Sequence, residues 1–307
     1  ENHLGELWSL VHFVAPGCLG ELKRFNQTWR TPIERNGDTA RAKMLAARVK
    51  PFLLRRTKDE VANDLPAKTV IVERVEFGSA QRDLYESVRL TMHDKVVAAL
   101  ADKGLARSRI VVLDALLKMR QACCDPRLVK LARKPAGRAG SAKLERLMEI
   151  VTELLAEGRR VLIFSQFTSM LDLIRPLLDA TGVRYALLTG DTRDRESQVV
   201  AFQDGAVPVF LVSLKTGGVG LNLTAADTVI LYDPWWNPAV ENQATDRAHR
   251  IGQDKPVFVY KLLCADTVEE RIQAMQDRKQ ALADQLQAGT GSGFSEQDLE
   301  LLLRPLQ

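Results

Sequence analysis

Short apolar runs alternate with amphipathic segments in the second half of the chain. The runs cover residues 161–164, 185–188, 209–212, 229–232 and 257–262, and apolar residues at helical spacing cover 142–157, 169–180, 193–203, 238–250 and 267–287. Near-continuous runs of Val, Ile, Leu and Phe separated by helices are typical of a parallel sheet with helices on both faces. The pattern therefore predicts an α/β domain that begins near Ser141.

The first 140 or so residues follow a different pattern, mostly helical and irregular. Apolar residues recur at helical spacing from Leu84 to Leu100, and the same spacing runs from Ile110 to Arg120. One run, 69–75, is rich in β-branched residues and predicts a strand. The stretch 133–140 is rich in Pro, Gly and basic residues and predicts an exposed connector between the two halves.

The C-terminal end carries start and stop signals for helices. Thr267 with Glu270 matches a capping box ahead of the long amphipathic segment. Residues 289–293 predict a flexible break, and Ser295 is placed to cap a short Leu-rich helix that ends near Pro305.

Length and composition place the chain among ordinary globular proteins. Its 307 residues allow about two domains of roughly 150 residues each. A hydrophobic fraction of 46% and a charged fraction of 27% exclude disordered, collagen-like and coiled-coil classes. No apolar run is long enough to span a bilayer, no leader opens the sequence, and four cysteines are too few for a disulfide framework. We therefore expect a soluble, cytoplasmic protein with reduced thiols and no membrane partner.

The net charge of +4 hides an uneven distribution. Residues 21–60 carry eleven Lys or Arg against five acids, and residues 101–140 carry ten against three, whereas residues 266–300 carry eight acids against three bases. Two basic patches suggest a track for a polyanion such as nucleic acid. Two solvated helical faces would give the same counts, so charge alone leaves both interpretations open.

The residues that follow the apolar runs are the candidates for chemistry, because ligands of parallel α/β sheets bind at the carboxyl ends of the strands. One such segment is the glycine-rich stretch 213–224, in which Gly217, Gly218 and Gly220 would let the backbone approach a phosphate. It matches neither a dinucleotide fingerprint, since Leu223 replaces the third glycine, nor a Walker loop. A purely structural turn is the alternative.

A second such segment, 237–253, combines a predicted helix with basic residues. Asn237 and Pro238 are helix-start residues, and Gly252 is placed to end the helix. Gln243, Arg247 and Arg250 would then share one helix face at i, i+4 and i+7. Two guanidiniums on one face can grip a transferring phosphoryl group. The alternative is that Asp246 simply pairs with Arg250 on the surface.

The tryptophans, histidines and cysteines give weaker indications of a functional site. The tandem Trp235 and Trp236 follow a predicted strand and fit either half-buried core or a surface that stacks on nucleic acid. The four histidines are scattered, and Cys123 with Cys124 lacks a partner pair at zinc spacing. We therefore expect no metal ligands here, and we expect the two cysteines to pack a helix end.

The motifs together resemble one family. The stretch from Val209 to Gln253, with SLKTGGVGLNLTAADTVILYDPWWNP and QATDRAHRIGQ, resembles the fifth and sixth helicase motifs of the Swi/Snf-type ATPases, the double-stranded DNA translocases of helicase superfamily two. Further matching strings are ENHLGELWSL, PFLLRRTKDEVANDLPAK, LKMRQACCDP, VLIFSQFTSML and LTGDTRDRE. The resemblance covers essentially the whole chain.

This resemblance implies a fold and a mode of action. It implies two RecA-like lobes that close on ATP with Mg²⁺ and bind a DNA duplex across both. The chain would begin inside the third motif of the first lobe, without the Walker loop and the acidic Mg²⁺ motif, so it would hold the second lobe with helical protrusions. Its partners would be double-stranded DNA and the upstream lobe. As a fragment it is expected to have no ATPase activity by itself.

The resemblance also implies residue roles, carried over position by position. Arg247 and Arg250 are expected to be arginine fingers with Gln243 beside them, and Gly217, Gly218, Gly220 and Asn222 are expected to couple nucleotide to DNA. Ser165, Gln166, Ser213, Lys215 and Trp236 are the expected DNA contacts, whereas the role of Trp235 stays open. Arg55, Arg56 and Lys58 would belong to the segment between the lobes.

The expected domain organisation has four parts. Residues 1–60 would hold the end of the first lobe with a helical protrusion, 61–140 a first strand and a second protrusion, 141–266 the RecA-like C-terminal lobe, and 267–307 helices that brace the lobes. Arg outnumbers Lys 28 to 15, which favours a bacterial source and hence association with the nucleoid. Two rival functions are a translocase that acts on RNA polymerase or RNA-containing duplexes and a non-catalytic module that binds DNA or a protein.

Overall fold

The computed structural model describes residues 4–54, 65–129, 140–216, 220–235, 237–286 and 301–306. The chain forms two compact units, one of residues 1–63 with 282–293 and the other of residues 64–281 with 294–307. Arg55, Arg56, Lys58, Gly217, Gly218, Trp236 and the predicted break and cap at 289–295 lie outside the described residues, as does nearly all of the predicted connector.

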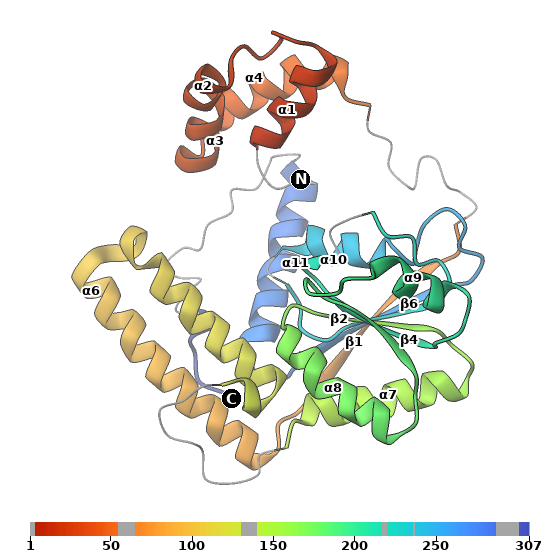
Figure 1. The fold of residues 1–307 in the computed structure, drawn as a ribbon. Helices are drawn as coiled ribbons and strands as arrows, with labels where there is room; N and C mark the ends of the chain where they lie inside the picture. The colour runs from red at the N-terminus through yellow and green to blue at the C-terminus, as the bar shows by residue number, and fades with distance from the viewer. Residues whose placement is uncertain are drawn as a thin grey trace. The chain divides into compact units, whose positions relative to one another are not determined.

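The first unit is helical. It contains α1 (Leu4–Val14), α2 (Leu22–Phe25), a π-helical turn (Asn26–Arg30), α3 (Thr31–Asn36), α4 (Thr39–Val49) and a 3-10 turn (Lys50–Phe52) (Figure 1). Asp38 caps α4, because its carboxylate accepts a hydrogen bond from the amide of Arg41 at 2.9 Å. Buried apolar side chains from these helices and the turn between them form one small core, namely Val11, Leu19, Phe25, Leu45 and Val49.

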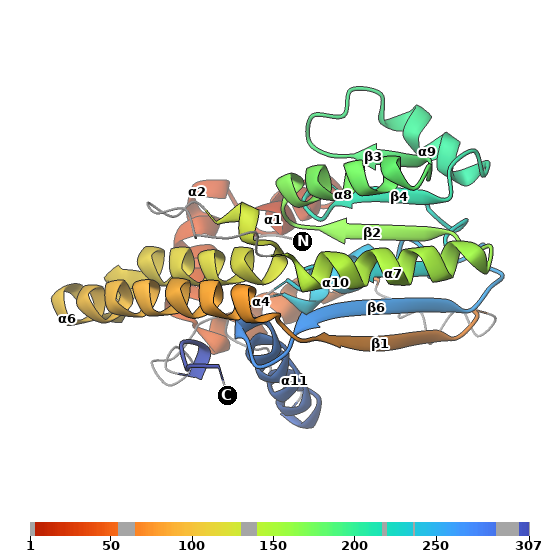
Figure 2. The ribbon, with the colours of Figure 1, turned by 90° about the horizontal axis from the view of Figure 1, so that it is seen from below.

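The second unit is built on a six-stranded parallel sheet, as predicted. Its strands are β1 (Lys68–Val75), β2 (Val161–Ser165), β3 (Tyr185–Leu188), β4 (Val209–Ser213), β5 (Thr228–Leu231) and β6 (Val257–Cys264). They lie in the order β1-β6-β5-β2-β4-β3, and every pair is parallel (Figure 2). The central strands β2, β4 and β5 are buried along their whole length. This burial explains why they read as unbroken apolar runs.

Helices cover both faces of the sheet. The core of one face combines α7 (Ala142–Ala156) and α8 (Thr168–Ala180) with Val161 and Ile163 of β2, and these helices face the viewer in Figure 2. The core of the other face combines α9 (Arg195–Gln203) and α10 (Pro238–Thr245) with Leu162 and Phe164. Alternate residues of one strand therefore enter opposite cores.

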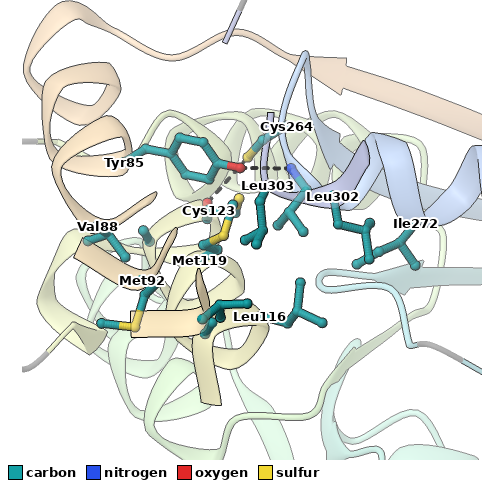
Figure 3. Packing of buried hydrophobic residues seen from close by; sticks show 14 of the residues in the cluster. Tyr85, Val88, Met92, Leu116, Met119, Cys123, Cys264, Ile272, Leu302 and Leu303 are labelled. Carbon is teal, nitrogen blue, oxygen red and sulfur yellow. Dashed lines mark hydrogen bonds between the residues drawn. The ribbon is translucent and has the colours of Figure 1, made fainter. Parts of the chain in front are cut away.

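A long helical hairpin lies beyond the ends of the strands. It is α6 (Ser79–Cys124), whose two arms meet at Gly104, where φ is 67°. In Figure 2 it extends from the edge of the sheet toward which the arrows of β2 and β6 point. Its inward residues pack against α11 (Val268–Leu286) and against Leu302 and Leu303 near the C-terminus (Figure 3). The hydroxyl of Tyr85 accepts a hydrogen bond from the amide of Val268 at 2.8 Å in this core.

Two local predictions were wrong. The helix expected over 238–250 ends at Thr245 and continues as turns, in which the amides of Arg247 and Ala248 donate to carbonyls three residues earlier, Ala244 at 3.4 Å and Thr245 at 3.1 Å. The expected capping box also differs. Thr267 Oγ1 accepts from the amide of Glu269 at 3.2 Å, while Glu270 accepts from the amide of Asp266 at 2.9 Å.

Candidate nucleic-acid and nucleotide interface

The candidate site lies at the carboxyl edge of the sheet, where the loops after β2 and β5 run side by side. Ser165 ends β2 and is followed by Gln166, while Asp233 lies two residues beyond the end of β5. The backbone amide of Gln166 donates to both carboxylate oxygens of Asp233, at 3.2 and 3.1 Å. Ser165 Oγ closes a local turn by accepting from the amide of Phe167 at 3.1 Å. Ser165 and Gln166 are therefore held in place by neighbours and are buried.

Asp233 is a carboxyl group without contact to solvent. Desolvation raises its pKa from 3.8 to about 6, although the charge of Arg120 and the hydrogen bonds from Ser165 and Gln166 oppose this shift. Sequence reasoning identified 233–237 as a strand-end segment but gave Asp233 no role. Its structural role is to fix the backbone that follows β2 to the backbone that follows β5.

Arg120 joins the helical hairpin to the same two loops. It lies near the end of α6 with a side chain that is almost completely buried. Nη1 donates to Oε1 of Gln166 at 2.9 Å, Nη2 donates to the carbonyl of Pro234, and the guanidinium carbon lies 5.7 Å from the ring centroid of Trp235. The sequence showed Arg120 only as one member of a helical pattern. Its contacts are made across 46 and 114 residues of sequence and leave no local signal.

Trp235 is half-buried and bonded through both of its backbone groups. Its amide donates to Oε1 of Glu241 at 2.8 Å, and its carbonyl accepts from Nε2 of Gln276 at 2.6 Å. Glu241 in turn pairs with Lys261, with Nζ and Oε2 2.7 Å apart. Three helices, α6, α10 and α11, therefore contact this one residue.

Arg247 lies in the turns that follow α10 and is buried against the sheet. Its guanidinium carbon is 5.9 Å from the ring centroid of Phe164, the residue before Ser165. Nε donates to the carbonyl of Gln243 at 3.3 Å, whereas Nη1 is buried without a hydrogen-bond partner among the described residues. Desolvation lowers the pKa of Arg247 to about 10. Among the described residues no ion pair of Arg247 is found, so desolvation dominates its environment.

The three residues predicted to share a helix face are not equivalent. Gln243 lies on α10 and is exposed, Arg247 is buried in the turn, and Arg250 is exposed beyond it. Gln253 holds this turn against the loop before β5, because its Nε2 donates to the carbonyls of Thr224, Ala226 and Ala248 at 3.1, 2.7 and 3.0 Å. Sequence reasoning gave Gln253 no role.

The glycine-rich loop is described only at its two ends. Ser213 is buried at the end of β4, while Lys215, Gly220 and Asn222 are exposed. Leu223, the next residue, donates its amide to the carbonyl of Arg247 and so ties the loop to the arginine-bearing turn. The structure thus brings together the ends of β2, β4 and β5 and Arg247 on one edge of the sheet.

A cluster of metal-binding residue types occurs elsewhere among the described residues. The ligand atoms of Cys123, Cys264 and Glu269 lie within 4.8 Å of one another and are buried. The carboxylate of Glu269 is engaged by Lys143 and by the amide of Cys264, and burial raises the pKa of the Cys123 thiol well above its usual value. A protonated thiol and a paired carboxylate are poor metal ligands, so packing explains the cluster better.

Two family models match the chain. Residues 1–128 match the SNF2-related domain, and residues 142–252 match the helicase conserved C-terminal domain. These are the domains of a helicase-like ATPase. Within the part of the chain that the structure describes, no helix has the length and apolar character needed to cross a membrane.

Several relatives align along nearly the full chain. YwqA of Bacillus subtilis is 41% identical over 292 residues, covering 93% of this chain and 31% of its own length. A protein of Mycoplasma pneumoniae described as an uncharacterized ATP-dependent helicase is 37% identical, covering 99% of this chain and 28% of its own. The bacterial source expected from composition agrees with these similarities. The chain spans about a third of the length of the curated relatives it matches.

Solved structures agree with the fold. The SWI2/SNF2 ATPase core of Sulfolobus solfataricus in complex with double-stranded DNA is 32% identical with a TM-score of 0.63, covering 98% of this chain and 64% of that one. The C-terminal domain of the same ATPase is 28% identical with a TM-score of 0.60, covering 78% of this chain and 99% of that one. The predicted RecA-like fold is thereby confirmed. With both family models matched in order and this fold, the chain belongs to the SNF2 family of helicase-related ATPases.

Proposed function

We propose that the chain is the C-terminal lobe of an ATP-dependent double-stranded DNA translocase, which contributes arginine fingers and part of a DNA-binding surface. Arg247 and Arg250 would reach the phosphates of ATP held by an upstream lobe. The observation that carries this proposal is the buried guanidinium of Arg247, whose Nη1 has no partner among the described residues. A buried cation is costly unless an anion meets it, and a nucleotide phosphate is an anion of the right geometry.

The proposed roles of Arg247 and Arg250 in phosphoryl transfer follow from their different environments, one buried and one exposed. Negative charge on the phosphoryl oxygens shifts during transfer, and a pre-oriented guanidinium stabilises the transition state. Arg247 is held over Phe164 and bonded at Nε, so little reorganisation is needed when a phosphate arrives. Arg250 is exposed and can move to complete the grip. Gln243, also exposed, lies beside them as a further polar contact.

ATP is the substrate in this proposal, and Mg²⁺ its counter-ion. Two carboxylates beside the proposed nucleotide contact are poor Mg²⁺ ligands, since Asp233 is buried and bonded to Gln166, and Glu241 is bonded to Trp235 and paired with Lys261. The edge instead offers arginines. We therefore assign Mg²⁺ to the upstream lobe, with Gly217, Gly218, Gly220 and Asn222 as the loop that couples the nucleotide to DNA.

The DNA surface would use the loops after β2 and β4. Lys215 is exposed, and the side-chain Nε2 of Gln166 is buried without an acceptor among the described residues. A phosphate oxygen could provide that acceptor after a small shift of the loop. Ser165 and Ser213 lie at the same strand ends and stay proposed DNA contacts; both are buried, so they would meet DNA only after the loops that follow them move. Trp236 remains a proposed contact. The DNA in the Sulfolobus complex makes a duplex the expected partner.

The four-part division at residues 60, 140 and 266 belongs to the same proposal. Residues 1–60 would hold the end of the upstream lobe with a helical protrusion and the start of the linker, and 61–140 an entry strand, which is β1 of the sheet, with a second helical protrusion. Residues 141–266 would be the lobe itself, and 267–307 would be helices that pack on or brace the lobes. In a bacterial cell such a protein would associate with the nucleoid. No observation favours RNA polymerase or an RNA-containing duplex as the target.

The test is ATP hydrolysis by the full-length protein with and without duplex DNA. Arg247→Ala and Arg250→Ala should each lower the DNA-stimulated kcat by about a thousandfold, the magnitude expected for an arginine finger. Arg175→Ala is the matched control, because Arg175 forms a surface pair with Asp172 and contacts Tyr185 at the opposite edge of the sheet. Turnover within tenfold of wild type in both finger variants would contradict the assignment.

A further inference from the structure

Arg120 is a buried arginine for which the proposed function has no role. Its side chain is the largest fully buried one among the described residues. A guanidinium loses its hydration when it is buried, so the site must satisfy it with several oriented acceptors. Its partners include the side chain of Gln166 and the carbonyl of Pro234, the ring of Trp235 lies close to the guanidinium, and the charge of Asp233 also acts on it.

These partners belong to two loops that leave adjacent strands. Gln166 follows β2 and Pro234 follows β5, and β2 pairs directly with β5 in the sheet. Arg120 itself comes from the second arm of α6, which lies beyond the same edge (Figure 2). One guanidinium therefore links the helical hairpin to both loops.

The hydrogen bonds of Gln166 and Trp235 restrict how the two loops can move. Because Nη1 of Arg120 takes Oε1 of Gln166, the amide group is oriented with its Nε2 donor turned away from Arg120. Because Trp235 is bonded at its amide by Glu241 and at its carbonyl by Gln276, the backbone is fixed immediately before residue 236. The contact between the guanidinium of Arg120 and the indole ring also restrains the orientation of the Trp235 side chain.

We propose that Arg120 is a positioning residue for duplex engagement. It orients Gln166 and the Trp235 loop together, so that movement of the α6 hairpin and of the DNA-facing loops is coupled. This inference rests on the proposed function, since it needs the loops after β2 and β5 to face DNA. It also gives Trp235 a role: its ring and backbone form the joint between α6, α10 and α11.

The experiment measures ATP hydrolysis by the full-length protein over a titration of duplex DNA. Arg120→Lys keeps the charge but loses the planar fork that holds two loops at once. We expect DNA-free hydrolysis within about twofold of wild type and a DNA concentration for half-maximal stimulation raised by about tenfold or more, because misplaced contacts weaken engagement.

Arg89→Lys is the matched control. Arg89 is also a buried arginine of α6, but it donates to the carbonyl of Leu303 and pairs with Glu86, far in sequence from both loops. The Arg89→Lys variant should lower Tm as Arg120→Lys does, but the DNA concentration for half-maximal stimulation should stay unchanged. If Arg120→Lys lowers Tm but leaves the DNA titration unchanged, Arg120 only packs the core and the inference fails.

Two further outcomes are separable. Wild-type protein that no duplex stimulates would overturn the proposed function itself. If Arg120→Lys does not fold, Gln276→Ala removes the bond to the Trp235 carbonyl from α11 and leaves Arg120 in place. It should raise the half-maximal DNA concentration by about threefold or more, and an unchanged titration in that variant would count against the inference.

Discussion

The ammonium group of Lys143 and the carboxylate of Glu269 form an ion pair with side-chain exposures of 0% and 1%. Lys143 lies in the first turn of α7 and Glu269 in the first turn of α11, so the pair joins the starts of these two helices. Burial alone would lower the pKa of Lys143, but Cys264 and the carboxylate of Glu269 raise it above its ordinary value. Lys143 is therefore charged throughout the physiological range.

Removing one partner of this pair should be costly. Lys143→Met leaves a buried carboxylate unpaired, so we expect the free energy of unfolding to fall by about 3–5 kcal/mol in urea denaturation at pH 7. The double variant Lys143→Met with Glu269→Gln removes both charges and should lose clearly less than the sum of the two single losses. Additive losses would show that the two groups do not interact.

Asp233 should make stability depend on pH. Its pKa is about 6 in the folded protein against 3.8 ordinarily, so between these values the folded state binds more protons than the unfolded state. Its contribution to stability is therefore present at low pH and is lost as the pH rises through about 6. The Asp233→Asn variant does not lose this stability as the pH rises, because the amide of Asn does not titrate.

The stability of Asp233→Asn relative to wild type should then rise by about 2–3 kcal/mol between pH 4 and pH 6.5. Urea denaturation across that range measures the difference, in which other titrating groups cancel. A difference that stays flat with pH would mean that Asp233 is ionised normally in the folded protein.

The C-terminal segment should contribute to the core around α6. Leu302 is fully buried there (Figure 3). The carbonyl of Leu303 accepts from Nη1 of Arg89 at 3.0 Å. Leu302→Ala should lower the free energy of unfolding by about 2–5 kcal/mol, through lost burial and a cavity. Ile110→Ala is the control, since Ile110 is 81% exposed, and it should change stability by less than about 0.5 kcal/mol. Equal effects would argue against docking of the segment.

His249 should stabilise the start of β1. One ring nitrogen, Nε2, lies 2.8 Å from the carbonyl of Pro66, and the next residue, Ala67, accepts from the amide of Val257 at 2.9 Å. His249→Ala should lower hydrogen-exchange protection of the Val257 amide by about tenfold, the loss of one net hydrogen bond. His93→Ala, at a half-exposed histidine of α6, should leave it unchanged. Unaltered protection in both variants would show that the contact does not hold the strand.

The sequence alone determined the local elements and the family. Five apolar runs and the run at 69–75 became the six strands. The runs of β2, β4 and β5 are apolar along their length because these strands are buried on both faces, whereas β1 is a mostly exposed edge strand that its β-branched residues predicted. The same logic located the carboxyl ends, and hence the segments that hold Gln166, Lys215 and Arg247. The motif strings indicated the family by resemblance, and the family models and the relatives confirmed it.

Only the tertiary structure decided how those residues differ. Helical spacing continues through Arg250, yet the helix ends at Thr245 and is followed by turns. In those turns Arg247 is buried beside Phe164 and its carbonyl accepts from the amide of Leu223, whereas Arg250 is exposed. The burial of Arg120 depends on Gln166 and Pro234, 46 and 114 residues away, and strand order brings those two together. Hydrophobic periodicity predicts which face of a helix or strand is buried. It does not predict which group from a distant part of the sequence packs against that face, because that depends on the tertiary structure.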